Sequence, residues 1–423
     1  MTRARGLSLS VVGLAALVWA LPLRLGFYAD RVITDIPVYR EVYEAIAAGG
    51  VPYRDFDVEY PPLAVALFWV AGAIPGDYGV AFSVLMLACL CATALGAMAI
   101  ARAIGLDRRR EAAAGIAVAL SPLLLGNLME TRFDLALAAL LAWTLWAAAA
   151  GRFRLAWGLL AAATLLKLVP LALVPALLVW QRHRAGLRPA LRGLAGSLAI
   201  VAAVVAPFAI LSPGGTWNQV QYHLDRPLQI ESLGSAYLLG LHALADIDVT
   251  VESSFGSQGL AGTGPRVIAA IATAVLAGLV VAIAWTLWAG LRRARPPADA
   301  RLFVAASAAT IAALLVGGKV LSPQFLVWLL PVGFVIAGRY GPAAFGLTGL
   351  SMLLTLAYFP HRYWDLVDLQ TLPIALLVLR DTALIALLAA CWPRPGIAGQ
   401  PLRLLREDPA AGRRAMAARY LTD

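Results

Sequence analysis

Apolar runs long enough to cross a lipid bilayer recur along nearly the whole chain. A helix needs roughly 20 mostly apolar residues to cross the hydrocarbon core, where every backbone polar group must be bonded internally. Of the 423 residues, 61% are hydrophobic and 14% are charged. No polar linker or low-complexity stretch divides the sequence into separate soluble domains. The sequence therefore predicts an all-α polytopic membrane protein.

Twelve crossings account for these runs when the arginine-rich connections are placed in the cytoplasm. The predicted crossings are residues 7–28, 78–104, 111–128, 133–150, 155–167, 169–181, 192–211, 265–291, 300–317, 323–338, 342–359 and 370–392. This even number places the N and C termini in the cytoplasm. We expect a single membrane domain, residues 1–392, and a basic cytoplasmic tail, residues 393–423.

The net charge of +10 does not indicate nucleic-acid binding, because the basic residues lie in short connections between the crossings. The pattern favours a multi-pass protein of the plasma membrane whose opposite, extracytoplasmic side is net acidic. The three cysteines all fall in apolar runs, so neither a disulfide framework nor a thiolate metal site is expected.

Three segments are too short for a full crossing. Residues 155–167 and 169–181 predict a re-entrant hairpin with the sequence KLVP at its tip, and residues 62–75 are expected to lie along the outer interface. Broken helices at membrane depth are tolerated where protein buries them or where they line a wet cavity.

The long loops 29–61 and 212–264 both emerge on the predicted extracytoplasmic side, so we expect the active-site face there. In the first loop, Thr34 or Asp35 precedes a helix that carries Tyr39 on one face. From spacing alone, Asp35 is either a capping carboxylate or a functional one.

The second loop holds a dense polar group in HLDRPLQIES, with His223, Arg226, Gln229 and Glu231 close together. Such a group is either a solvated loop with local ion pairs or part of a site. Only two of the 34 basic residues are lysines, Lys167 and Lys319, and both lie at predicted outer ends of crossings. A compact ammonium suits a phosphate contact, although chance is the alternative.

The stretch VPYRDFDVEYPP, residues 51–62, places three carboxylates at alternate positions. Alternate residues of an extended chain share one face, so these side chains point together at a cavity or at water. The DxD pattern of Asp55 and Asp57 is weak evidence for a metal site. We predict instead a polar rim on the acceptor side, with Glu59 and Tyr60 in contact with sugar.

Five stretches resemble glycosyltransferase family 87, the polyprenyl-phosphate-sugar-dependent enzymes of the GT-C membrane superfamily. They are DIPVYREVYEAIAAGGVPYRDFDVEYPPL, RFDLALAAL, AAATLLKLVPLALVPALL, RPLQIESL and GKVLSPQFLVWLLP, in the order that the family has them. The resemblance implies a GT-C-like bundle, a sugar delivered on a lipid phosphate, and an acidic base early in the first outer loop. Asp35 matches that position.

From this resemblance we expect transfer of mannose or arabinofuranose from a polyprenyl-phosphate donor to a glycolipid or envelope glycan in the lipid bilayer. A phosphate leaves without protonation, so one base, Asp35, suffices and the product is inverted. No cofactor is required, and a divalent metal is compatible but not implied. The predicted phosphate-binding cations are Arg226, Lys319 and Lys167. The predicted sugar-binding or acceptor-binding residues are Tyr39, Glu59, Tyr60, His223, Gln229, Glu231 and Gln324.

Gln324 follows Ser322-Pro323, where the family's actinobacterial mannosyltransferases have a His-containing stretch, and the sugar therefore stays open. The alternative function is a transporter or flippase of lipid-linked sugars, for which Arg380-Asp381 inside the last crossing would be a proton relay instead of a buried ion pair. Transporters often carry inverted repeats, and the two halves of this sequence show no self-similarity. A non-catalytic envelope scaffold is a third reading.

Overall fold

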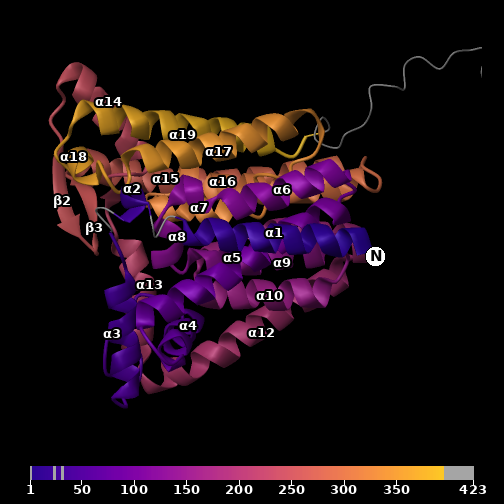
Figure 1. Cartoon of the computed structure of the whole chain (residues 1–423), viewed down its shortest axis with the longest axis horizontal. Coiled ribbons are helices and arrows are strands. Elements are labelled where there is room, and N and C mark those ends of the chain that lie inside the picture. The colour runs from indigo at the N-terminus through magenta and orange to yellow at the C-terminus, as the bar shows by residue number, and fades with distance from the viewer. Residues whose placement is uncertain (1, 22–24, 30–32, 395–423) are drawn as a thin grey trace, which may run out of the picture.

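The computed structural model describes residues 2–21, 25–29 and 33–394. Almost all of the predicted basic tail, residues 393–423, therefore lies outside the described residues. The described chain is mainly a bundle of roughly parallel helices, with a lobe of short helices and strands at one end (Figure 1).

Six helices of the described chain are long and apolar enough to cross a membrane. They are α5 (Tyr78–Ala103), α12 (Leu187–Leu211), α15 (Thr263–Leu291), α16 (Ala298–Gly317), α17 (Gly341–Tyr358) and α19 (Thr371–Cys391). Each coincides with a predicted crossing, because length and hydropathy alone determine that pattern. α16 is the central helix of the bundle, since nearly all of its residues are buried.

Five further helices contain apolar stretches of 10–17 residues, which in α1 is Arg5–Ala20. They are α1 (Thr2–Ala20), α4 (Pro62–Ala73), α9 (Asp134–Ala149), α10 (Phe153–Leu166) and α14 (Leu233–Ala245). The remaining helices are α2 (Gly26–Ala29), α3 (Ile36–Ala47), α6 (Arg108–Leu120), α7 (Pro122–Leu125), α8 (Leu128–Thr131), α11 (Val174–Ala185), α13 (Pro213–Asp225) and α18 (Tyr363–Val367). Short 3₁₀ helices cover η1 (Val169–Leu173), η2 (Pro323–Leu329) and η3 (Gly338–Tyr340).

The arginine-rich connections meet at one end of the bundle, which we call the arginine-rich end. Arg184, in the last turn of α11, lies 2.9 Å from the carboxylate of Asp299 at the start of α16. Arg301 donates hydrogen bonds to the backbone carbonyls of Ile104 and Gly105, just beyond α5. The chain begins at this same end (Figure 1).

The described parts of the two long loops form the opposite end, which we call the outer lobe. It contains α3, α13, α14 and the strands, so it joins segments that are far apart in the sequence (Figure 1). The imidazole Nε2 of His223 lies 3.1 Å from the carbonyl oxygen of Glu59. A side chain in place of Gly215 would collide with the carbonyl of Tyr53, so this glycine lets the first loop approach α13 closely.

The predicted hairpin at 155–181 forms, and its tip is Lys167. α10 runs antiparallel to α9, because Lys167 at its end contacts Asp134 at the start of α9. From the tip, η1 and α11 return to Arg184 at the arginine-rich end. Both arms of the hairpin therefore extend along the bundle from the arginine-rich end to the outer lobe.

Several predicted crossings differ from the structure, and the total of twelve stays a prediction. In the run 7–28, α1 ends at Ala20 and α2 begins at Gly26. The run 111–128 breaks after α6, because Pro122 cannot donate a backbone hydrogen bond within a continuing helix. The segment 323–338 is η2 followed by turns and not an α-helix, so its assignment as a regular crossing was wrong. Its residues from Leu326 to Ala337 are all buried, which is how irregular backbone is tolerated at membrane depth.

The expectation of an all-α protein is also wrong in one respect. The second long loop contains a small antiparallel sheet with strand order β1 (Leu228–Gln229), β3 (Ser257–Ala261), β2 (Thr250–Ser254). The β2 and β3 strands are joined by a tight turn at Phe255-Gly256, where both residues have positive φ. Hydropathy does not reveal such short polar strands.

A buried network connects α19 and α17 with the loop after β1. Arg380 Nε lies 2.6 Å from Asp381 Oδ1, and both side chains are fully buried. Arg380 also donates hydrogen bonds to the hydroxyl of Tyr358 and to the backbone carbonyl of Glu231. Arg380 and Asp381 therefore form an ion pair inside the bundle.

We predict that Asp381→Asn strongly destabilises the fold, because it leaves a buried guanidinium without its opposite charge. The expected loss is about 3–5 kcal/mol, measured as a lower thermal unfolding midpoint of the protein in detergent. The matched control is Asp365→Asn, which removes an exposed carboxylate 3.8 Å from Arg362 and should change the midpoint little. Equal losses in the two variants would contradict the assignment.

Candidate functional site

Asp35 occupies the position before α3, but its carboxylate does not cap the helix. Instead, the hydroxyl of Thr34 accepts a hydrogen bond from the backbone N–H of Ile36. The Asp35 carboxylate lies 2.9 Å from Arg132 Nε and accepts a hydrogen bond from the hydroxyl of Tyr39. The Asp35 carboxylate is therefore not a helix cap, and its contacts are with Arg132 and Tyr39.

Arg132 approaches Asp35 from the membrane bundle, where it precedes α9. Its side chain is only 6% exposed, whereas that of Asp35 is 31% exposed. A guanidinium this buried needs an opposite charge, which Asp35 supplies. The ion pair therefore fixes the start of α3 to the start of α9 and leaves one side of the Asp35 carboxylate open to solvent.

Opposing influences set the pKa of Asp35, which is raised above its ordinary value. Burial raises it most; Arg132 and the Tyr39 hydroxyl lower it, and the negative charges of Glu59 and Asp134 raise it again. Asp35 is thus a stronger base than an ordinary carboxylate, and Arg132 limits the rise.

Aromatic rings form the wall behind Asp35. The ring of Tyr39 stacks on Phe68 at 4.2 Å, and Phe133 meets Tyr60 edge to face at 5.0 Å. Tyr39 and Phe68 are fully buried. Tyr39, predicted to bind sugar, therefore supports the Asp35 carboxylate and packs in the core.

Lys167, predicted to bind phosphate, is already engaged. Its ammonium lies 2.8 Å from Asp134 Oδ1, which also accepts a hydrogen bond of 2.6 Å from the Trp328 indole. The rings of Phe133, Phe325 and Trp328 surround the ammonium at 4.6–5.1 Å. Lys167 thus holds the hairpin tip against α9 and η2.

Arg226 and Lys319 lie together on the α13 side of the outer lobe. Burial lowers the pKa of Lys319 most, the Asp225 carboxylate raises it, and the nearby Arg226 charge lowers it again. Lys319 donates a hydrogen bond to the carbonyl of Leu224, and Arg226 donates one to the hydroxyl of Ser257. The buried Arg226 Nε has no hydrogen-bond partner within the described part of the chain. Both cations are partly exposed.

His223 lies between the two groups of charges. Burial lowers its pKa most, the Glu59 carboxylate raises it, and the cations Arg226 and Lys167 lower it again. The predicted residues Glu59, His223, Arg226 and Lys167 therefore share one region with Asp35.

Gln229 and Glu231, which were predicted to bind sugar or acceptor, are both buried in the protein. Gln229 is buried, and its side-chain amide donates a hydrogen bond of 3.1 Å to the hydroxyl of Ser322. The Glu231 carboxylate accepts a hydrogen bond from Tyr358, and burial raises its pKa to about 7. These two residues connect β1 and the loop after it to the bundle. Gln324 lies partly exposed in the first turn of η2.

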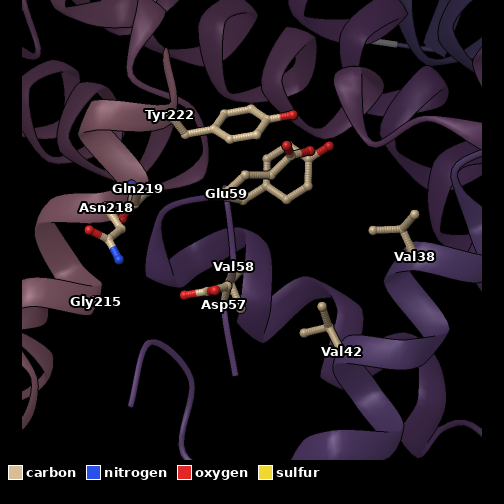
Figure 2. Close-up of a pocket in the computed structure, with 10 residues that line it drawn as sticks. Val38, Val42, Asp57, Val58, Glu59, Gly215, Asn218, Gln219 and Tyr222 are labelled. Carbon is tan, nitrogen blue, oxygen red and sulfur yellow. The ribbon is translucent and has the colours of Figure 1, made fainter. Parts of the chain in front are cut away.

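A pocket of about 440 Å³ opens between α3, residues 57–60 and α13 (Figure 2). Pockets of this size accommodate small molecules and their terminal groups. Val38 and Val42 extend into it from α3, and Asn218 and Tyr222 come from α13 (Figure 2). Glu59 lines the pocket and also influences Asp35, so the pocket adjoins the candidate base.

Arg132 and Asp134 were missed as site residues, although both stand in the RFDLALAAL stretch. Two ionisable residues at the start of an apolar run were the available signal, because such residues are retained only with a partner or a function.

The DxD pattern of the first loop does not form a cluster of metal ligands with other described residues. The Asp55 carboxylate accepts hydrogen bonds from the Arg54 guanidinium and from the Val51 backbone N–H. Among the described residues, no three His, Cys, Asp or Glu side chains are grouped to hold a metal ion.

The family comparison agrees with the resemblance seen in the sequence. Residues 59–323, more than half of the chain, match the model of glycosyltransferase family 87. No curated protein matches the chain. A solved structure with some similarity is the oligosaccharyltransferase of Archaeoglobus fulgidus in its apo form, at 15% identity and a TM-score of 0.44. The alignment covers 97% of this chain and 59% of that protein. The family match shows that the chain belongs to glycosyltransferase family 87.

Proposed function

We propose that this membrane glycosyltransferase moves a sugar from a polyprenyl-phosphate donor to a hydroxyl of a glycolipid or envelope glycan. The sugar is mannose or arabinofuranose, and transfer occurs on the extracytoplasmic side of the plasma membrane. The observation that carries the proposal is the Asp35 carboxylate, which contacts Arg132 and Tyr39 and is influenced by the charge of Glu59 in the pocket wall.

Asp35 is the general base in this mechanism. It accepts the proton of the acceptor hydroxyl as the oxygen attacks the anomeric carbon from the face opposite the phosphate. The phosphate departs as an anion and needs no proton, so a single carboxylate suffices and the anomeric configuration inverts. The raised pKa of Asp35 makes it a better proton acceptor, and Arg132 keeps it ionised between turnovers.

The donor phosphate binds Arg226 and Lys319 in this proposal. Both cations are partly exposed and close together, and Arg226 has a buried Nε without a partner in the described chain. Positive groups that face the departing phosphate stabilise the charge that develops there. Lys167 is less available, since Asp134 neutralises it, and it acts by positioning the hairpin tip.

The donor's lipid chain lies beside α12 and α15 in this proposal. In the most apolar 18-residue stretch of each helix, only 6% of the residues are buried inside the protein. The buried residues of α15 are Ile283, Leu287 and Leu291, all near the arginine-rich end, and the half near the outer lobe exposes apolar side chains such as Ile271. Figure 1 shows α12 diverging from α10 toward α13. These exposed halves offer a polyprenyl chain apolar surface at the level of the phosphate-binding cations.

We predict that Asp35→Asn abolishes most sugar transfer, because asparagine cannot accept the proton. The expected loss in kcat is about 100- to 10,000-fold. Transfer of radiolabelled sugar from the polyprenyl phosphosugar measures it. Because Asp35→Asn also leaves the buried Arg132 without its opposite charge, the thermal unfolding midpoint is measured as well, and the double variant Asp35→Asn/Arg132→Gln, which leaves no unpaired charge, should be equally inactive. Asp55→Asn is the control with the same charge change outside the site. A folded Asp35→Asn protein with full activity would exclude Asp35 as the base.

We predict that Arg132→Gln moves the acidic limb of the pH–activity profile to higher pH. The charged and polar groups that face Asp35 are Arg132, Tyr39, Glu59 and Asp134. Arg132 is the only cation among them, so its removal raises the pKa of Asp35 further. As the pH is lowered, Asp35 then becomes protonated and inactive at a higher pH than in the wild type. Arg132→Lys should restore most of the original profile. An unchanged limb in the glutamine variant would show that Arg132 does not act through Asp35.

A further inference from the structure

The pocket beside Asp35 has an acidic wall. Among the described residues that line it are two carboxylates, Asp57 and Glu59, and no lysine or arginine. Asp57 is exposed, and its carboxylate points toward α13 in Figure 2. No cation of the pocket wall therefore compensates these two negative charges.

The other groups in the wall suit a polyhydroxylated ligand. The amides of Asn218 and Gln219 donate and accept hydrogen bonds, and carboxylates accept them from hydroxyl groups. Tyr222 and the valines of α3 supply apolar surface for the C–H groups of a ring. A mainly apolar wall with a few polar groups is typical of small-ligand sites.

Arg226 and Lys319 lie beyond Tyr222, on the side where we propose that the donor phosphate binds. The guanidinium of Arg226 lies 5.9 Å from the Tyr222 ring centre, and Lys319 is near Arg226. Neither cation lines the pocket. The site is therefore divided into a basic donor side and an acidic side that disfavours an anionic ligand.

We propose that this pocket binds the neutral sugar terminus of the acceptor and that Asp57 discriminates against acceptors with an anionic group there. The proposal rests on the proposed function and adds the charge class of the acceptor. Asp57 does not discriminate against anionic groups further along a large acceptor, because these lie outside the pocket.

Asp55 provides a matched control two residues away. Its carboxylate bonds Arg54 Nε at 2.8 Å and the Val51 backbone N–H at 2.7 Å, and it does not line the pocket. Asp55→Asn and Asp57→Asn therefore make the same chemical change in the same loop, and only the second removes charge from the pocket wall.

The test uses the full chain in nanodiscs with a polyprenyl phosphosugar donor. The acceptors are an alkyl mannoside and the alkyl mannuronide of equal chain length, which differ by one carboxylate. Wild type should prefer the neutral acceptor, measured as a ratio of kcat/KM. Asp57→Asn should reduce this preference roughly five- to tenfold through a lower KM for the mannuronide, and Asp55→Asn should leave it unchanged.

Binding is also measured without the donor, by saturation-transfer NMR on each variant. If wild type binds the mannoside more tightly than the mannuronide and transfers no sugar to either, the proposed function fails but the pocket assignment stands. If wild type uses both acceptors equally, or if Asp55→Asn changes the preference as much as Asp57→Asn, the neutral-acceptor proposal is wrong and the transferase function stands.

Discussion

The ion pair between Arg132 and Asp35 connects the chemistry of this protein to its membrane bundle. Arg132 is almost completely buried at the start of α9, so it requires a carboxylate partner. That partner comes from the first long loop, which is thereby held at the end of the bundle. The same contact lowers the pKa that burial has raised. One interaction thus positions the proposed base and keeps it ionised.

Phe133 and Asp134, which follow Arg132 in the sequence, connect the ion pair to the rest of the site. Phe133 follows Arg132 and packs against Tyr60, and Asp134 then binds Lys167 and Trp328. Three consecutive residues therefore join the first loop, the hairpin tip and η2. A site built in this way is rigid on the bundle side and open on the side of α13, where the pocket and the partly exposed cations lie.

The proposed function gives the separation of charge across this site a chemical reason. A lipid-phosphate donor requires cations where negative charge develops, whereas a sugar hydroxyl that is about to lose a proton requires a carboxylate. Arg226 and Lys319 lie on one side of Tyr222, and Asp35, Asp57 and Glu59 contribute negative charge on the other.

The long helices could be predicted from the sequence because hydropathy and length determine them, as for α5 and α19. The irregular segment after Pro323 could not, since its burial depends on neighbouring helices that hydropathy does not describe. Asp35 was predicted as the base from a family resemblance, because spacing alone left open whether it is a capping carboxylate or a functional one. Arg132 and Asp134 required the fold, because their partners are far away in the sequence. The cytoplasmic termini and the GT-C-like arrangement stay predictions.

The configuration of the newly formed glycosidic bond tests the central claim most directly. A single displacement with Asp35 as the base and phosphate as the leaving group inverts the anomeric carbon. The measurement is the NMR coupling constant of the anomeric proton in the product, compared with that of a donor of known configuration. We predict inversion. Retention would contradict the single-displacement mechanism and require a covalent intermediate or another nucleophile.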